Sequence, residues 1–382
     1  MITEVLLEQL EEDASTSVLF QGFLEPGAQA AQALLVLGKV ARTRFWTPPS
    51  MVKRLIAESD PVFTADRTTL RAEAFSPCCG VYARLDLLEA GELGEGCTNV
   101  DLSEATRTVL AGVVAQDPLH LTVRGEGIRL RTLDGQNDES VVPLPDRWVS
   151  GFAEVAAVTA GAVEKAELDK AELDKAEARN FLRKLPTSVG KSWAVASGRG
   201  LRLTSRPGRD SIPATGLHRL RIVEPLIRFV QGLTVYTRSD SEVATWVLRL
   251  ERARLVVTLS PEPSRGFSGE GGWLNVLAAG LEAPELVAGR AGHDVVDGTW
   301  FSRELPSGAV PANGRLAKAR ELLAAGAVRM LPDGGYEITR AGSVQRVRLS
   351  PAGCTCAWWA KHQENRGPCS HVLAARMSAA ES

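Results

Sequence analysis

The segment CTCAWWAKHQENRGPCSH, residues 354–371, contains three of the six cysteines of this 382-residue chain. One residue separates Cys354 from Cys356, twelve residues follow, and one residue separates Cys369 from His371. Thiolate and imidazole groups bind Zn2+ in closed tetrahedral sites, and three Cys with one His form a common structural set. The spacing therefore predicts one structural zinc ion, bound by Cys354, Cys356, Cys369 and His371.

The spacing within each pair also predicts local structure around this site. Residues i and i+2 of an extended segment point to the same side, so Cys354 and Cys356 are expected at the end of a strand. On a helix the same two positions diverge by about 200°. Cys369 is therefore expected just before a helix, with His371 in its first turn. Four protein ligands leave no position open for water, which argues against a catalytic zinc.

The residues around the cluster are more basic than the rest of the chain. Residues 311–382 contain ten Lys and Arg against five Asp and Glu, and the remaining residues contain 34 against 41. The overall net charge of -2 therefore combines an acidic body with a basic C-terminal region. A basic region of this kind favours an acidic partner, which is either DNA or the surface of another protein.

Aromatic and cationic side chains lie between and before the two ligand pairs. Paired aromatic rings beside cations stack bases or contact phosphates. Alternatively, one tryptophan packs beneath the zinc site as its small core, and the cations are solvated. The candidate partner-binding residues are Trp358, Trp359, Lys361, Arg366, Arg346 and Arg348.

The rest of the chain predicts an α+β fold with several domains. We expect an N-terminal domain of mixed helices and strands over 1–162, a middle domain over 185–310, and a C-terminal region over 311–382 that ends in a small ββα-like zinc module. Residues 165–177 read KAELDKAELDKAE, and most of these residues are strong helix formers without an apolar stripe. This repeat predicts a charged helical linker over 163–184.

Alternating apolar residues and turn signals predict the individual elements of the domains. A helix is expected to begin at Pro225, since proline is tolerated at the first position of a helix, and another at Arg315–Ala324. Strands are predicted at Gly80–Leu87, His120–Val123, Ile128–Thr132, Glu139–Leu144, Leu233–Arg238, Ala244–Leu250, Arg254–Leu259, Val328–Leu331, Tyr336–Thr339 and Val344–Leu349.

The remaining composition excludes several classes of protein. The chain is 44% hydrophobic and 24% charged, which is typical of globular proteins and not of disordered or disulfide-stapled chains. Cys78, Cys79 and Cys97 lack a C-x-x-C spacing and are expected to be inert buried thiols. The N-terminal sequence is acidic, and no apolar run is long enough to span a bilayer, so no membrane segment and a cytoplasmic location are expected.

The pattern C-x-C-x12-C-x-H, entered from a hairpin and closed by a short helix, closely resembles the SWIM zinc finger over about residues 343–378. More loosely, the whole chain is similar to bacterial SWIM zinc finger family proteins, through residues 265–271, residues 78–82 and the RGPCSHVLAA ending. The resemblance implies a zinc-dependent module that binds DNA or protein.

Bacterial members of this family often occur beside MoxR-type AAA ATPases and von Willebrand A-domain proteins, so the resemblance also implies a non-enzymatic adaptor. The histidines before residue 300 lack a Ser, Cys or Asp partner at a recognisable spacing, which gives no support for a hydrolase triad. The alternative is an enzyme of unknown reaction. Its site would lie before residue 300, and the finger would recruit its substrate.

Overall fold

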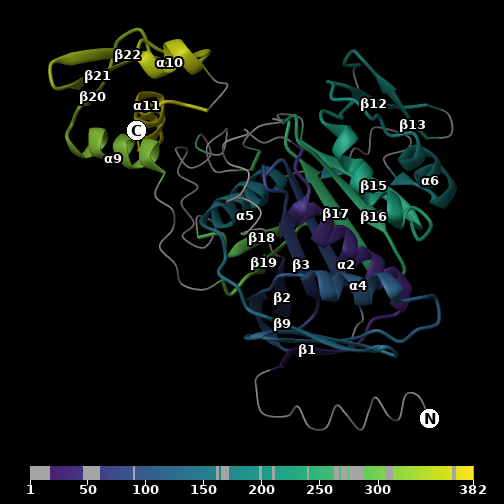
Figure 1. Cartoon of the computed structure of the whole chain (residues 1–382). Coiled ribbons are helices and arrows are strands. Elements are labelled where there is room, and N and C mark those ends of the chain that lie inside the picture. The colour runs from purple at the N-terminus through teal and green to yellow at the C-terminus, as the bar shows by residue number, and fades with distance from the viewer. Residues whose placement is uncertain are drawn as a thin grey trace.

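The computed structural model describes residues 18–45, 61–88, 91–160, 163–164, 172–197, 200–208, 211–238, 241–261, 266–267, 274, 288–305, 313–363 and 367–381. These residues mix helices with antiparallel strands, which confirms the α+β prediction. Figure 1 shows a large body and a smaller C-terminal lobe beside it. Within the described ranges, no helix is long and apolar enough to cross a membrane.

One antiparallel sheet of nine strands organises the body, with the order β10-β15-β16-β17-β4-β3-β2-β6 and with β11 also paired to β15. Its strands are β2 (Val62–Asp66), β3 (Leu70–Phe75), β4 (Val81–Leu87), β6 (Glu95–Asn99), β10 (Val163–Glu164), β11 (Glu172–Leu173), β15 (Gly232–Thr237), β16 (Ala244–Arg249) and β17 (Ala253–Leu259). At its centre, β4 pairs with β17 along the full length of both strands. Strands of the expected N-terminal and middle domains therefore form one continuous sheet, and the boundary between 1–162 and 185–310 does not separate two sheets.

Two smaller sheets and several helices complete the body. The five-stranded sheet has the order β5-β1-β7-β8-β9, formed by β1 (Val18–Phe23), β5 (Glu92–Leu93), β7 (His120–Arg124), β8 (Gly127–Thr132) and β9 (Gly135–Ser140). A three-stranded sheet contains β12 (Trp193–Ala196), β13 (Leu201–Thr204) and β14 (Ile212–Pro213). The helices are α2 (Gly27–Arg42), α4 (Glu104–Gly112), α5 (Asp146–Thr159), α6 (Lys175–Arg183) and the 3-10 helix η3 (Leu217–Leu226).

The predicted strands agree closely with the observed ones, apart from Glu139–Leu144, whose place is taken by the earlier strand β9. The charged linker over 163–184 is not one helix. Its first and later segments form β10 and β11 on the edge strand β15, and only α6 is helical; residues 165–171 lie outside the described part. Helix propensity is a weak preference, and backbone pairing to an open sheet edge overrides it here.

The prediction that a helix begins at Pro225 is wrong, because this residue lies near the end of η3. The reason is the spacing of the apolar side chains. Leu217, Leu220, Val223 and Leu226 recur every third residue, and all are buried. A period of three matches the 3-10 helix rather than the α-helix, so this segment buries one stripe in the tighter conformation.

The two faces of the nine-stranded sheet differ in character. On one face lie apolar side chains such as Ala72, Leu85 and Leu255, all fully buried in the main hydrophobic core together with residues of α2. Phe181 of α6 stacks on Trp246 of the same face, with 5.6 Å between ring centroids. The alternating residues, on the opposite face, are largely polar and charged.

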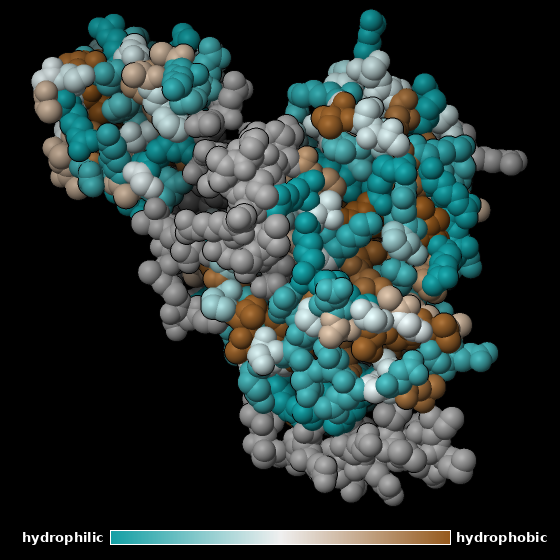
Figure 2. Space-filling view, viewed as in Figure 1, coloured by the Kyte–Doolittle hydropathy of each residue, from teal (hydrophilic) through white to brown (hydrophobic). Residues whose placement is uncertain are grey.

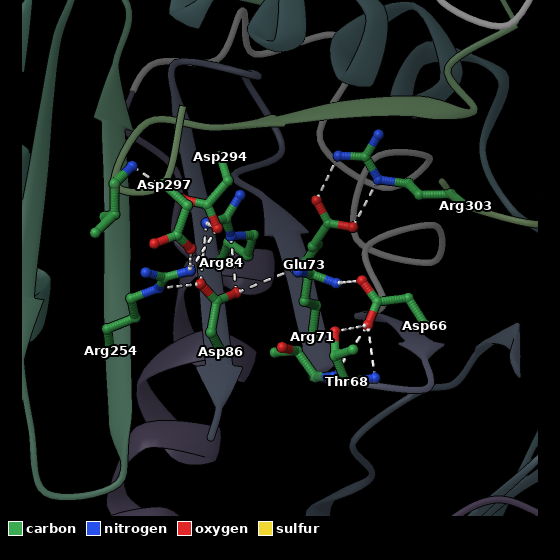
Figure 3. A network of polar contacts seen from close by, with 12 residues as sticks. Asp66, Thr68, Arg71, Glu73, Arg84, Asp86, Arg254, Asp294, Asp297 and Arg303 are labelled. Atoms are coloured by element: carbon green, nitrogen blue, oxygen red, sulfur yellow. Dashed lines mark hydrogen bonds and ion pairs between the residues drawn. The ribbon is translucent and has the colours of Figure 1, made fainter. Parts of the chain in front are cut away.

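The charged face is buried as well. Arg71, Asp86 and Arg254 lie opposite one another on β3, β4 and β17, so that charges alternate across three strands. In the next row Glu73 of β3 lies opposite Arg84 of β4. Figure 3 shows this network, which is closed from above by residues of a hairpin formed by β18 (Ala291–Asp294) and β19 (Thr299–Ser302). Helix α5 covers the same face beside the hairpin, through contacts of its aromatic residues with Phe75 of β3.

The Glu73 carboxylate has no exposed surface. It accepts two hydrogen bonds of 2.7 Å from the guanidinium of Arg303 and a third from Tyr82. Burial alone raises the pKa of Glu73, but the positive charges of Arg303 and Arg84 outweigh burial, and the pKa is lowered. Burial likewise raises the pKa of Asp294, and Arg84 and Arg254 reverse this to a net decrease.

We predict that Arg303→Met lowers the free energy of unfolding by about 3–5 kcal/mol, because it leaves the Glu73 carboxylate buried without its counter-charge. The double variant Glu73→Leu/Arg303→Met should recover most of this loss, since no unpaired charge remains. Urea unfolding followed by tryptophan fluorescence measures both. A double variant as unstable as the single one would contradict the prediction.

We also predict that stability falls on acidification through these carboxylates. Their folded pKa values lie below the unfolded values of about 4, so their contribution is complete above about pH 5. It is lost progressively as the pH falls from about 4 through the lower folded values. Unfolding midpoints in urea at several pH values measure this. The variant Glu73→Leu/Arg303→Met should lose less stability than the wild type as the pH falls from about 5 to about 3, and an identical loss would refute the assignment.

Candidate metal centre

The C-terminal lobe consists of a four-stranded sheet and three helices. The sheet has the order β20-β21-β22-β23, formed by β20 (Val328–Met330), β21 (Tyr336–Arg340), β22 (Ser343–Leu349) and β23 (Ala352–Cys354). The helices are α9 (Gly314–Ala324), α10 (Ala357–His362) and α11 (Ser370–Glu381). Helix α11 packs against both α9 and the inner face of the sheet.

Each of the four predicted ligands lies at the end of an element. Cys354 is the last residue of β23, and Cys356 caps α10, where its Sγ accepts a hydrogen bond from the backbone N–H of Trp359 at 3.4 Å. Cys369 immediately precedes α11, and His371 lies in the first turn of that helix. These positions are those that the spacing predicts, with one ligand pair entering from a strand and the other from a helix start.

The geometry of the four side chains fits one tetrahedral zinc ion. Their ligand atoms all lie within 4.8 Å of one another, and Sγ of Cys354 is 3.8 Å from Nδ1 of His371. Zn–S bonds of about 2.3 Å and Zn–N bonds of about 2.0 Å place tetrahedral ligand atoms about 3.5–3.8 Å apart. Cys356 and Cys369 are buried, whereas Cys354 and His371 are half-buried. The site is therefore compact and largely enclosed by protein.

The thiols influence one another strongly. The pKa of Cys369 is lowered, first by a hydrogen bond from Cys354 and also by its contact with His371. The pKa of Cys354 is raised, because its proton is held in the bond to Cys369. Burial and the neighbouring negative charge raise the pKa of Cys356. Zinc requires thiolates, so a bound ion would replace the shared proton with a positive charge.

The two tryptophans of α10 are half-buried, and both pack against the hydrophobic core of the lobe. The guanidinium of Arg315 lies 4.9 Å from the centre of a Trp358 ring and donates a 2.9 Å hydrogen bond to the carbonyl oxygen of Pro368. Arg315 thus joins α9 to the segment before Cys369. No sequence pattern indicates this role, since Arg315 lies far from the ligands in sequence and is one of many basic residues.

The predicted cationic residues are dispersed over the lobe. Arg346 and Arg348 are exposed on β22, and Lys361 is exposed at the end of α10. Arg366 lies outside the described residues. The structure therefore places two of the candidates on one strand, separate from the loop that holds the tryptophans. Figure 2 shows hydrophilic residues over much of the visible surface of the lobe.

The remaining cysteines are distant from this cluster. Cys78 and Cys79 are buried in the turn between β3 and β4, and Cys97 is half-buried on β6. Burial raises the pKa of Cys79 and of Cys97 to about 12 in each case, which leaves both thiols protonated and unreactive. These properties agree with inert packing.

A cleft of about 470 Å3 lies on the body, lined by the segments that follow β1, precede β7 and join β16 to β17. Its charged lining includes Glu25 and Arg252, which form an ion pair of 2.9 Å, and Asp117, which accepts a 2.8 Å hydrogen bond from the backbone of Val114. These carboxylates therefore have structural partners, and the cleft does not by itself indicate a reaction.

Comparisons with known proteins bear on the lobe rather than on the body. A search of curated proteins found no match. Among solved structures, the proliferating cellular nuclear antigen of Entamoeba histolytica overlaps with 64% of this chain and 100% of its own, at 10% identity and a TM-score of 0.40. A TM-score this low does not establish a common fold. The family model of the SWIM zinc finger matches residues 338–375, which include all four clustered ligands. Residues 338–375 of the C-terminal lobe therefore match a SWIM zinc finger.

Proposed function

We propose that the finger binds one structural zinc ion and uses the surface that this ion organises to bind a partner, without catalysing a reaction. The supporting observation is the enclosed Cys354, Cys356, Cys369 and His371 cluster within a segment that matches the SWIM model. With four protein ligands the ion has no open position for substrate or water. Its chemical contribution is to hold β23, α10 and α11 together.

The outer face of the finger sheet is the best candidate for the contact surface. Val347 of β22 is buried toward α11, so the alternating Val344, Arg346 and Arg348 point to the opposite side, where all three are exposed. Glu337 lies opposite Arg346 on β21 and forms an ion pair with Arg329 of β20. We name these five residues the finger face. They combine three cations, one anion and one exposed apolar side chain.

This composition favours an acidic segment of a protein over DNA. The tryptophans that would stack bases pack instead against the core of the finger, with Trp358 beneath Arg315. An apolar side chain between arginines is typical of protein interfaces, where arginine is enriched and long aliphatic stems add buried area. We therefore propose an adaptor. Partnership with a MoxR-type AAA ATPase and a von Willebrand A-domain protein is supported by the family resemblance alone.

We further propose that the protein works in a reducing compartment such as the cytoplasm. All three cysteine ligands are free thiols that lie close together, so an oxidising environment would favour a disulfide between two of them over metal binding.

We predict that the wild-type chain contains one zinc ion and that Cys356→Ser loses nearly all of it, because one of four tetrahedral ligands is removed. Elemental analysis after gel filtration measures the metal content. Cys97→Ser is the matched control and should keep its zinc. Less than one ion in the wild type, or unchanged zinc in Cys356→Ser, would refute the site. Since structural zinc contributes roughly 10 kcal/mol or more to local folding, chelation should unfold the finger.

We predict that reversing the charge of the finger face with Arg346→Glu/Arg348→Glu weakens binding of a glutamate-rich peptide by about tenfold or more. Fluorescence anisotropy with the labelled peptide measures the affinity, and zinc content confirms that the variant is folded. The control Arg202→Glu/Arg206→Glu changes two exposed arginines of the body by the same charge and should bind normally.

Duplex DNA is the second probe in the same assay. Tighter binding of DNA than of the peptide, with a steep decrease between about 50 and 200 mM salt, would contradict a protein partner and favour nucleic acid. Equal affinities of the Arg346→Glu/Arg348→Glu variant and its control for both probes would remove the finger face from the proposal.

A further inference from the structure

The hairpin of β18 and β19, residues 291–302, forms a strap over the charged face of the sheet. Its two strands pair with each other and form a separate two-stranded sheet. Ala291 lies opposite Ser302 at one end, and Asp294 lies opposite Thr299 at the other. Among the strands that the structure describes, none of the nine-stranded sheet pairs with it. Side-chain contacts with the sheet and packing of β18 against α5, rather than a shared backbone ladder, therefore hold the strap in place.

Ion pairs form the first set of these contacts (Figure 3). Asp294 accepts hydrogen bonds from Arg84, at 2.9 Å, and from Arg254. Asp297 accepts a 3.1 Å hydrogen bond from the same group of Arg254. The two strap carboxylates thus satisfy guanidinium groups of β4 and β17 at the centre of the sheet, where Asp86 alone would face both arginines.

A buried aromatic ring forms the second set. Phe301 is 8% exposed, and its ring centre lies 4.3 Å from the guanidinium carbon of Arg71, 5.1 Å from that of Arg84 and 4.7 Å from that of Arg303. Such cation–π contacts are worth most where water is excluded. Gly292 lies opposite Phe301, and a Cβ there would come within 2.2 Å of the ring, so only glycine permits this insertion.

Apolar packing beneath the strap is limited. Among the residues that the structure describes, Val295 forms a small cluster with Tyr236, Val247 and Val256 of the sheet. The opposite sheet face, by contrast, belongs to the main core of the body. Charges that lose their protein partners regain water, and buried ion pairs therefore add little net stability compared with apolar burial. Lifting the strap therefore exposes less apolar surface of the sheet than separating the opposite face from the main core would.

We propose that the strap is a charge-held latch, which opens as a unit while the nine-stranded sheet stays folded and thereby uncovers the charged face of that sheet. Ala291 of the strap packs against the cluster of buried residues that also contains the zinc ligands Cys356 and Cys369. The same cluster contains Ala153, Ala156 and Ala157 of α5, which packs against β18, so opening of the latch loosens the packing of that helix as well. This inference goes beyond the proposed function, because it depends neither on zinc nor on the identity of a partner.

Native-state hydrogen–deuterium exchange of the full chain, resolved by peptide mass spectrometry, tests the latch. Elements of low local stability exchange through openings that cost less than global unfolding. In the wild type we expect the amides of β18 and β19 to exchange faster than those of β4 and β17. Equal exchange of the strap and the central strands would overturn the proposal.

Variants distinguish a latch from general instability. Asp294→Asn removes the charge that Arg84 and Arg254 share, and strap exchange should accelerate on the order of a hundredfold with β4 unchanged. Asp138→Asn is the control, since it breaks an exposed ion pair with Arg129 on the five-stranded sheet and should not affect the strap. Equal acceleration of β4 in Asp294→Asn would overturn the latch.

The milder variant Asp297→Asn keeps the test valid if Asp294→Asn does not fold. The Asp297 side chain is 59% exposed, so its loss should leave the fold intact. We expect strap exchange to rise about threefold, which corresponds to the weak pairing of an exposed carboxylate. If the strap of Asp297→Asn exchanges no faster than the strap of the Asp138→Asn control, the proposal is overturned.

Discussion

A buried guanidinium or carboxylate requires a partner of opposite charge, and this requirement shapes the body of the protein. The alternation that puts Ala72 and Leu85 toward the main core puts Arg71, Glu73 and Arg84 on the other side of the same strands. In most antiparallel sheets such a face is in contact with water. Here it is covered, and the cover supplies the matching charges Asp294 and Arg303. The strap could not be replaced by an ordinary apolar hairpin without leaving several charges unpaired.

The constraint on the finger is different, because it is a small module. A module of this length buries little apolar surface of its own, and a metal ion compensates for a small core. The four ligands come from the end of β23 and from the starts of α10 and α11. Trp358 and Trp359 then add to the core beside the ion instead of projecting from the loop. The aromatic pair therefore stabilises the finger, whereas Arg346 and Arg348 of β22 stay exposed.

Local patterns predicted the finger well, since its ligands lie within 18 residues. Their spacing constrains the backbone to a strand end at the first pair of ligands and to a helix start at the second pair. Several strands of the body, such as β4, β15, β16 and β17, were also predictable, because each alternates over a few residues. In contrast, β1, β2, β3 and β6 were not predicted. What could not be predicted is which distant strands pair. Nothing in residues 81–87 specifies residues 253–259 as their neighbour, and the strap lies in a glycine-rich stretch without a clear period. The prediction of a linker helix was wrong for the same reason, because a sheet edge supplied by distant residues outweighed the local helix propensity. The alternation of charge at 71, 73, 84 and 86 was the one available sign that a polar face needed a charged cover.

Helix α5 belongs to both parts of the molecule. Trp148 and Phe152 lie in the main core, whereas Ala153, Ala156 and Ala157 belong to the buried cluster of the finger. A genetic screen for loss of finger activity would therefore recover alleles in this helix, far in sequence from any zinc ligand. Such alleles would be easily misread as evidence for a second binding site. Their suppressors would be expected among the small residues of α9 and α11, which share the same packing space.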